Sequence, residues 1–259
     1  MNTVQMAEIT SRECKKYLEE GGDLVFVPMG SIERLGPHLP LASKCFVVYA
    51  ISEALAKRNR GYCLPVLPYS TLYDTYSGAG SMSVDAKILY DYTYDISKEL
   101  MENGFRRIIF VSYFKELYYV IAEFFQEKDL PIAWISPDQI PFPEAKDENT
   151  RVTSLVAACL KLCGREDLLE RLLAENKKHF GKFKGPLSER YPLSELRKLG
   201  RMGYHFKKDE YEILPVETVL VDEAVAAINK WVEEKVPAVE ALKEYAYYIS
   251  RARFDRGLR

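Results

Sequence analysis

Residues 24–41 read LVFVPMGSIERLGPHLPL and carry the clearest fold signal in the chain. The segment begins as a continuous apolar run, which is typical of a strand buried on both faces of a parallel sheet. It then becomes rich in glycine and proline, which predicts a loop directly after the strand. Open α/β sheets bind their ligands in loops at the carboxyl edge of the strands. We therefore expect this loop, which carries Glu33 and His38, to form the floor of a functional site.

Composition limits the class of protein. The chain has 259 residues, of which 47% are hydrophobic, enough for a sizeable core and too many for a disordered protein. Its formal net charge is −2, with 36 basic against 38 acidic residues, which gives no support for binding to nucleic acid or an anionic membrane. No apolar run is long enough to span a membrane, and the first residues lack a signal-peptide pattern. The five cysteines form no C-x-x-C pair, so we expect reduced thiols and a cytoplasmic location.

Apolar strands alternate with amphipathic helices through the first half of the chain. This alternation predicts a three-layer α/β/α sandwich with a mainly parallel sheet and helices on both faces. The expected strands are 24–28, 63–68, 106–113 and 131–136, and the expected helices are 12–20, 43–58, 86–101 and 114–127.

The pattern changes after residue 137. We expect a single α/β domain over 1–259, in which the mixed, weakly periodic segment 178–217 forms an insertion or subdomain. Helical periodicity predicts the remaining elements, which are helices at 149–162, 166–176, 221–234 and 237–253.

Residues 28–41, PMGSIERLGPHLPL, resemble the first motif of the creatininase (creatinine amidohydrolase) family. That motif runs roughly P-x-G-S-x-E-Q-H-G-x-H-L-P-L and reaches an Asp three residues later. In the family, its Glu, its first His and that Asp are ligands of a two-metal site. Glu33 stands at the Glu, whereas Leu35 and Lys44 stand at the His and the Asp. The resemblance therefore implies a creatininase-like fold with an altered metal site.

Three further blocks resemble the family in the same order. Residues 69–84 resemble Y-G-x-S-x-E-H-x-x-F-P-G-T-I-S-L, and residues 147–154 resemble H-A-G-x-x-E-T-S. Residues 103–116 resemble H/N-G-F-R-R-I-V-x-V-N-G-H and the ligand Glu that follows it. In that block Phe114 stands at the ligand His and Glu116 at the ligand Glu. The matches in the other two blocks are Tyr69, Gly80, Ser83, Thr153 and Ser154.

The resemblance would imply Zn or Mn, but the ligand positions argue against either metal here. A two-metal hydrolase needs about five ligands to hold its ions and generate a hydroxide. Of these positions, only Glu33 and Glu116 carry carboxylates, and Leu35 and Phe114 have no lone pair to give. Lys44 would place a cation where a bridging carboxylate belongs. We therefore expect no metal cofactor, and a self-neutralising set in which Lys44 pairs with Glu33 and lies close to Glu116.

The candidate site residues are Glu33, His38, Lys44 and Glu116, and each also has a structural interpretation. Glu33 is a residual ligand or acid–base group, or a buried carboxylate paired with Lys44 or backbone N–H groups. His38 is a proton-transfer group, or it bonds the backbone of its own loop. Glu116 is a pocket residue or an exposed carboxylate in the first turn of a helix. Cys45, beside Lys44, is a nucleophile or a small hydrophobic residue facing the core.

Three functions agree with these patterns. The first is a creatininase-family pseudoenzyme that has lost the two-metal site and binds a small polar ligand or a partner subunit. The second is an active metal-dependent amidohydrolase of a cyclic or small amide with a relocated ligand set. The third is a structural subunit assembled with an active paralogue. The resemblance also implies a homo-oligomer, often a hexamer in this family, and several tyrosine clusters are compatible with an interface. The relocated ligand set would comprise Glu33, His38, Asp74, Glu116 and Asp147.

Overall fold

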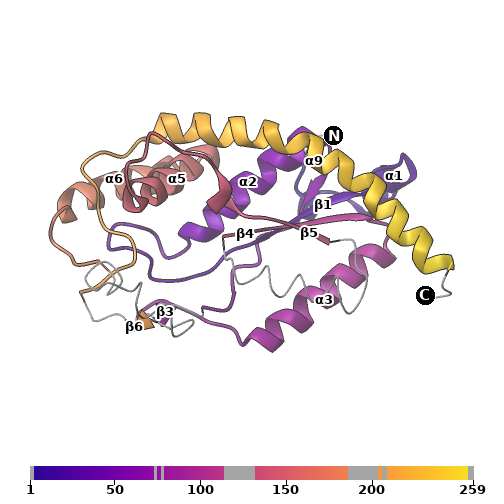
Figure 1. Ribbon diagram of the computed structural model, residues 1–259, viewed down its shortest axis with the longest axis horizontal. Coiled ribbons are helices and arrows are strands. Elements are labelled where there is room, and N and C mark those ends of the chain that lie inside the picture. The colour runs from indigo at the N-terminus through magenta and orange to yellow at the C-terminus, as the bar shows by residue number, and fades with distance from the viewer. Residues whose placement is uncertain are drawn as a thin grey trace.

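The core of the protein is a four-stranded parallel sheet (Figure 1). The structure is a computed structural model that describes residues 3–72, 75–76, 79–113, 132–185, 204–205 and 209–255. Strand β1 lies inside the sheet and pairs with β4 along its whole length, from Leu24 opposite Arg107 to Met29 opposite Ser112. The strand order is β2-β1-β4-β5, with β1 at Leu24–Met29, β2 at Tyr62–Cys63, β4 at Arg107–Ser112 and β5 at Ile132–Ile135.

Helices cover both faces of this sheet, which confirms the expected three-layer sandwich (Figure 1). One layer consists of α2 (Ser43–Asn59), α5 (Glu148–Leu162) and α9 (Val221–Asp255). The opposite layer contains α3 (Ala86–Glu102), and α1 (Ser11–Glu19) packs into the same core. Side chains cap two of these helices, because Thr10 forms a capping box at α1 and Asp85 caps α3.

The side chains of β1 explain why its sequence is continuously apolar. Leu24 and Phe26 point into the core shared with α2, α5 and α9. Val25, Val27 and Met29 point into the core shared with α3. Because successive side chains of a strand face opposite sides, a sheet covered on both faces leaves no position for a polar residue.

The smaller elements complete the described chain. They are the 3-10 helices η1 (Met6–Glu8) and η2 (Pro137–Gln139), helix α6 (Glu166–His179) and a parallel pair of short strands, β3 (Thr75–Tyr76) and β6 (Tyr204–His205). Strand β2 is shorter than the predicted 63–68, although Leu67 still forms a bridge with Met29. The predicted helix 114–127 and much of the segment 178–217 lie outside the described residues.

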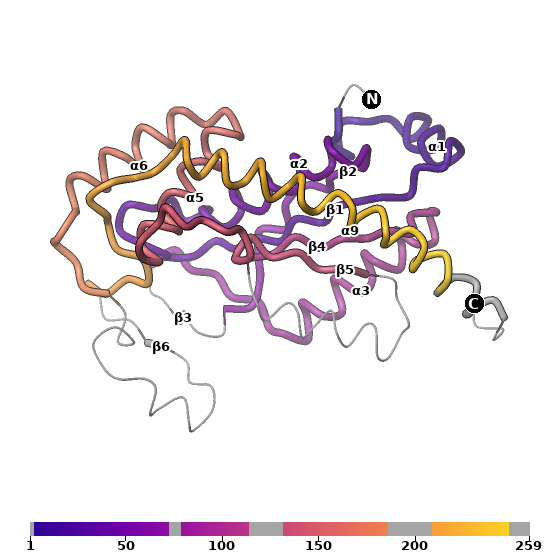
Figure 2. The backbone as a smooth tube through the Cα atoms, turned by 45° about the horizontal axis from the view of Figure 1, so that its top comes forward, coloured from indigo at the N-terminus to yellow at the C-terminus, as the bar shows by residue number. Residues whose placement is uncertain are grey.

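The prediction of two helices at 221–234 and 237–253 is wrong, because α9 is one helix that contains Pro237. A proline removes one backbone hydrogen bond and crowds the preceding turn, so it favours a break. Here burial on both sides of the proline favours a continuous helix, since Trp231 and Val232 before it and Val239 after it are all in the core. Figure 2 shows the result, a helix that runs past α5 and on along the sheet.

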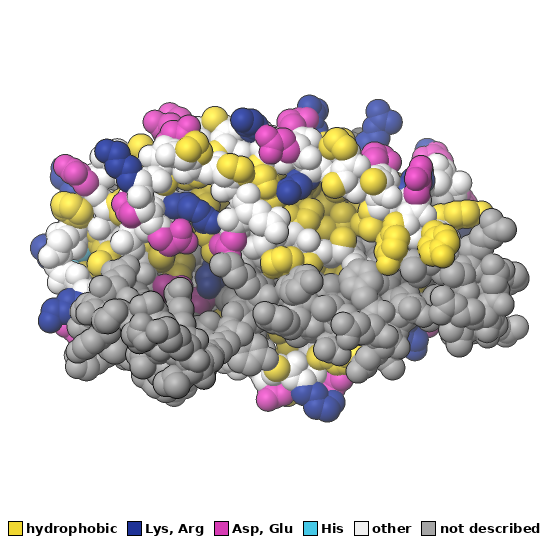
Figure 3. Space-filling model, viewed as in Figure 1, with side chains coloured by type: hydrophobic (Ala, Val, Ile, Leu, Met, Phe, Trp, Pro, Cys, Tyr) yellow, Lys and Arg dark blue, Asp and Glu magenta, His cyan; other side chains and the backbone are white. Residues whose placement is uncertain are grey.

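The face shown in Figure 3 carries charged side chains of both signs among apolar ones. Across the described part of the chain, no helix combines the length and the apolar character needed to cross a membrane.

Candidate functional site

The strand order reverses between β1 and β4, and in this fold class a ligand crevice lies at the carboxyl ends of such strands. The connection after β1 leads to β2 on one side, whereas β5 follows β4 on the other side. Such a reversal between neighbouring parallel strands separates the connecting segments and leaves room for a ligand. The segments that leave the sheet here carry Glu33 after β1, Tyr113 after β4 and Asp138 after β5. The loop expected from the sequence to form a site therefore lies where this fold class binds its ligands.

Backbone hydrogen bonds hold the loop after β1 in place. The amide of Glu33 donates to the carbonyl of Leu41 across the loop, at 3.0 Å. The carbonyl of Leu35 accepts from the amide of Ile213, also at 3.0 Å, which ties the loop to the segment before α9. Both contacts fix the backbone on either side of Glu33 and limit where its carboxylate can point.

Gly30 allows the start of α2 to approach the end of β1. A Cβ atom at Gly30 would lie 2.6 Å from the Cα atom of Cys45 and 2.8 Å from its backbone nitrogen. Only glycine permits such contact between two backbones. The first turn of α2, which carries Lys44 and Cys45, is thereby pressed against the loop that carries Glu33.

The ion pair expected between Glu33 and Lys44 is present. Lys44 Nζ lies 2.9 Å from Glu33 Oε1, and the two side chains are only 11% and 2% exposed. The hydroxyl of Ser31 donates to the same carboxylate oxygen. Burial lowers the pKa of the Lys44 ammonium, but Glu33 and then Glu212 raise it by more, so the net shift is upward. Lys44 is thus held as a cation inside the site.

A second group of polar residues surrounds this pair and was missed from the sequence. The ring of Tyr113 has its centroid 5.7 Å from Lys44 Nζ. Arg151, in the first turn of α5, donates from Nη2 to the carbonyl of Asp138 at 2.9 Å. Glu212 acts electrostatically on both Lys44 and Tyr113. These residues come from separate segments, so no sequence motif groups them. The sequence signal for a site residue among them was that Tyr113 directly follows a buried strand.

His38 is buried beside the site and is bonded away from the pair. Its Nε2 lies 2.9 Å from Thr153 Oγ1 on α5, and only 4% of the residue is exposed. Burial, followed by the nearby His179, lowers the pKa of His38 to about 4. The neighbouring Ser154 accepts a hydrogen bond from the amide of Leu220. The Thr153-Ser154 match in the fourth block therefore anchors two loops to α5. The printed partner of His38 is a side chain of α5 and not, as the structural interpretation expected, the backbone of its own loop.

The other candidate residues are placed as follows. Leu35 is buried in the core, where it offers no ligand atom. Cys45 is buried, and its thiol donates to the carbonyl of Ser31, while burial raises its pKa to about 11. A thiol in this state is a poor nucleophile, which favours the hydrophobic interpretation. Asp74, Phe114 and Glu116 lie outside the described residues.

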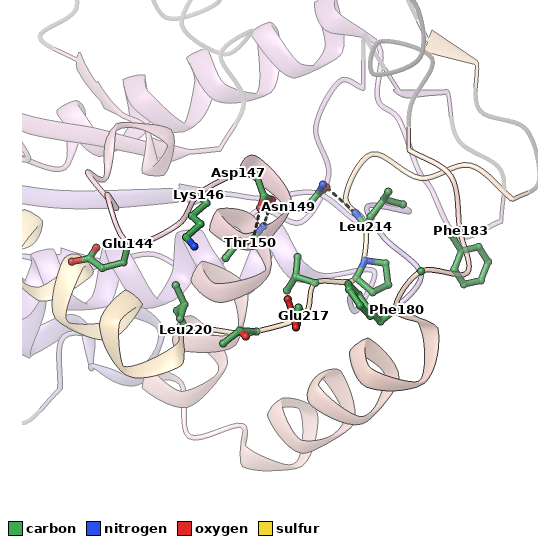
Figure 4. A pocket seen from close by; sticks show the side chains of 14 residues that line it. Glu144, Lys146, Asp147, Asn149, Thr150, Phe180, Phe183, Leu214, Glu217 and Leu220 are labelled. Carbon is green, nitrogen blue, oxygen red and sulfur yellow. Dashed lines mark hydrogen bonds between the residues drawn. The ribbon is translucent and has the colours of Figure 1, made fainter.

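Asp147 caps α5 at the rim of a separate cavity (Figure 4). Its two carboxylate oxygens accept hydrogen bonds from the amide and the hydroxyl of Thr150. The cavity has a volume of about 620 Å³ and lies between the start of α5, the end of α6 and residues 214–220. On one side Asn149 accepts a hydrogen bond from the amide of Leu214, drawn in Figure 4. Neither Glu33 nor Lys44 lines this cavity.

The described residues do not fit a two-metal centre. Among them, no three His, Cys, Asp or Glu side chains are grouped so that they could hold a metal ion. In addition to Glu33, the structure describes two positions that are metal ligands in the family. These positions hold the apolar side chain of Leu35 and the ammonium of Lys44. An ammonium bound to the carboxylate competes directly with a metal ion for that ligand.

A parallel α/β/α sandwich with a polar site at its switch point belongs to the class of open-sheet α/β proteins that bind ligands at the carboxyl edge of the sheet. The sequence model of the creatininase family, described as creatinine amidohydrolase, matches residues 7–150. The chain belongs to the creatininase family.

Known proteins agree with this assignment. Creatinine amidohydrolase from Pseudomonas putida is 25% identical over 115 residues, which are 42% of this chain and 44% of that protein. The alignment thus spans less than half of this relative. A crystal structure of creatinine amidohydrolase (creatininase) has a TM-score of 0.68 at 16% identity, covering 92% of this chain and 97% of that one. A structure entitled "Creatininase Mn" has a TM-score of 0.62 at 17% identity, covering 91% and 99%. At these identities the solved structures establish the fold alone.

Proposed function

We propose that this chain is an amidohydrolase-like member of the creatininase family whose hydrolytic metal site has been replaced by the Glu33–Lys44 ion pair. In this proposal the protein binds a small polar ligand or a partner subunit in the crevice and does not hydrolyse an amide there. The observation that carries the proposal is the contact of 2.9 Å between Glu33 and Lys44, which stand at two family ligand positions.

Electrostatics supports the replacement. Carboxylates that converge in an enclosed pocket repel each other, and two divalent cations offset that repulsion in a metal site. Lys44 supplies a positive charge at the same place and binds Glu33 directly. A metal ion at Glu33 would have to displace this ammonium, and Leu35 offers no ligand atom in return.

The relocated ligand set is less well supported. Asp147 uses both carboxylate oxygens to cap α5, and His38 is hydrogen-bonded to Thr153. The homo-oligomeric state, the association with a paralogous subunit and the cytoplasmic location stay predictions that follow from the family resemblance and from composition.

A gain-of-function experiment tests the proposal. We expect the wild-type protein, supplied with Zn or Mn, to show no creatinine hydrolysis. Lys44→Asp combined with Leu35→His and Phe114→His should acquire metal affinity measurable by calorimetry, because these changes restore the family's ligand types. Lys57→Asp, on an exposed part of the same helix, is the matched control for the charge change and should acquire none. Equal metal binding by the wild-type protein and the triple variant would contradict the proposal.

A further inference from the structure

The ion pair between Glu33 and Lys44 is almost closed to water. Glu33 is 1% exposed, and the side chain of Lys44 is 11% exposed. A small molecule can reach buried charges of this kind only when part of the surrounding structure opens, and local opening involves the segments with the weakest attachments. The segments that cover the pair therefore decide whether a ligand can reach it.

One of these segments is 209–220, which leads into α9. Its residue Ile213 donates from the backbone amide to the carbonyl of Leu35, at 3.0 Å, in the loop that carries Glu33. The residue before it, Glu212, acts electrostatically on Lys44. The segment thus lies on the loop and brings a charged side chain near the pair.

The second half of this segment is anchored to two helices. Asn176 of α6 is buried, and its side-chain amide makes two hydrogen bonds of 2.8 Å with the backbone of Val216. Ser154 of α5 is also buried, and it accepts a hydrogen bond of 2.9 Å from the amide of Leu220. Because buried hydrogen-bonding groups are costly to leave without partners, we expect residues 214–220 to stay in place.

The first half of the segment, residues 209–213, is held by Arg34. The guanidinium of Arg34 lies over the ring of Tyr211, with Cζ 4.2 Å from the ring centroid, and Nη2 donates to the carbonyl of Glu210. The amide of Tyr211 also donates to the carbonyl of Lys184 at 3.1 Å. Lys184 is an exposed residue after α6, so this bond does not tie the segment to the sheet.

Arginine suits this contact for a chemical reason. Its planar guanidinium is always charged, stacks on aromatic faces and can donate several hydrogen bonds at once. The first family motif has Gln at the position of Arg34. A glutamine side chain is shorter and uncharged, so it cannot replace the stacking and the hydrogen bond together. The contact is therefore a feature of this chain and not of the motif.

We propose that Arg34 is a latch that holds residues 209–213 closed over the Glu33–Lys44 site, and that release of this latch admits a ligand. Residues 209–213 would move about the anchored part at 214–220. The inference rests on the proposed function, because it takes the surroundings of the ion pair to be a ligand site.

Two substitutions remove the latch from either side, and one control matches them. Arg34→Gln removes the guanidinium, whereas Tyr211→Leu removes the ring on which it stacks. Tyr211→Phe is the conservative variant, because it keeps that ring. Arg165→Gln is the matched control at the start of α6. The guanidinium of Arg165 also lies over an aromatic ring, that of Phe46 at 5.8 Å, and also pairs with a neighbour, Asp167.

Hydrogen exchange and lysine labelling provide the two measurements. Amide exchange would be followed by mass spectrometry on overlapping peptides that cover 209–220, β1 and β4. Access to the site would be measured with acetic anhydride, which acetylates free amines. The labelling of Lys44 would be compared with that of Lys57, which is 62% exposed on the same helix and serves as the internal reference.

We expect Arg34→Gln and Tyr211→Leu to accelerate amide exchange within 209–213 by roughly tenfold or more, because each loses the cation–π contact and Arg34→Gln also loses a charge-assisted hydrogen bond. The labelling of Lys44 relative to Lys57 should rise in both variants. Exchange in β1 and β4 should stay as in the wild-type protein. Tyr211→Phe and Arg165→Gln should match the wild-type protein in both measurements.

Three results would overturn the inference. Unchanged exchange within 209–213 in both variants would show that Arg34 does not hold this segment. Faster exchange there with unchanged labelling of Lys44 would show that the segment does not close the site. Faster exchange throughout β1 and β4 would show that Arg34 supports the whole fold. Each result leaves the proposed function standing, since that proposal depends on metal content, and two metal ions bound at Glu33 would contradict it whatever the exchange data.

Discussion

Lys44 Nζ lies 2.9 Å from Glu33 Oε1, and both side chains are almost excluded from water. Glu33 lies in the loop after β1 and Lys44 in the first turn of α2, so the contact depends on how that loop meets the helix. The same ion pair therefore contributes to the stability of the fold and sets the charge of the site.

Removal of the ammonium should destabilise the protein strongly. Lys44→Ala leaves the Glu33 carboxylate buried without its cation, and breaking one side of a buried pair costs roughly 3–5 kcal/mol. The free energy of unfolding would be measured by urea denaturation, with the midpoint compared at an unchanged slope.

A neighbouring pair on the same helix provides the control. Lys57 Nζ lies 2.8 Å from Glu53 Oε1, but the lysine side chain is 62% exposed. Lys57→Ala should change the free energy of unfolding by about 0.5 kcal/mol or less. If both substitutions had the same small effect, the Glu33–Lys44 pair would not be the buried interaction described above.

Stability should depend on His38 in mild acid. Burial lowers its pKa from an ordinary 6.5 to about 4, so between these values the unfolded chain binds more protons than the folded one. The free energy of unfolding should then fall as the pH falls from 6.5 towards 4, by about 3 kcal/mol from this residue. His38→Gln, which cannot titrate but retains a donor for Thr153, should flatten that part of the curve. An unchanged acid limb in His38→Gln would show that the histidine is not the titrating group.

Gly30→Ala should destabilise the contact between β1 and α2. The added Cβ would lie 2.6 Å from the Cα atom of Cys45, so the helix start must move, and overpacking of this kind costs about 1–3 kcal/mol. Cys45→Ala removes the sulfur, which would lie 2.7 Å from that Cβ, but leaves the backbone contact. The double variant should therefore stay destabilised relative to Cys45→Ala, as measured by thermal unfolding. Full rescue would show that the sulfur, and not the backbone, limits the approach.

The fold was largely predictable because its signals are local. The apolar runs predicted strands at 24–28 and 106–113 from short stretches of sequence, and β1 and β4 lie there. The continuity of α9 could not be read in this way. Pro237 is a local signal for a break, whereas the packing on both sides of it involves residues distant in the chain.

The site was predictable only where a family pattern fixed the positions. The pairing of Glu33 with Lys44 followed from their places in the first motif. Tyr113, Asp138 and Arg151 follow no common pattern, and they meet because three segments leave the same edge of the sheet. Sequence spacing does not report such a meeting, since it depends on strand order and on the start of α5.

The metal content of the purified protein tests the central claim most directly. The protein would be purified without chelator and analysed for metal, then loaded with excess Zn or Mn, desalted and analysed again. Both elemental analyses should find well under one equivalent of metal per chain. The expected result follows from Lys44 bound to Glu33 and from Leu35 at a second ligand position. Two tightly bound metal ions per chain, removable by a chelator with the loss of a hydrolytic activity, would contradict the account.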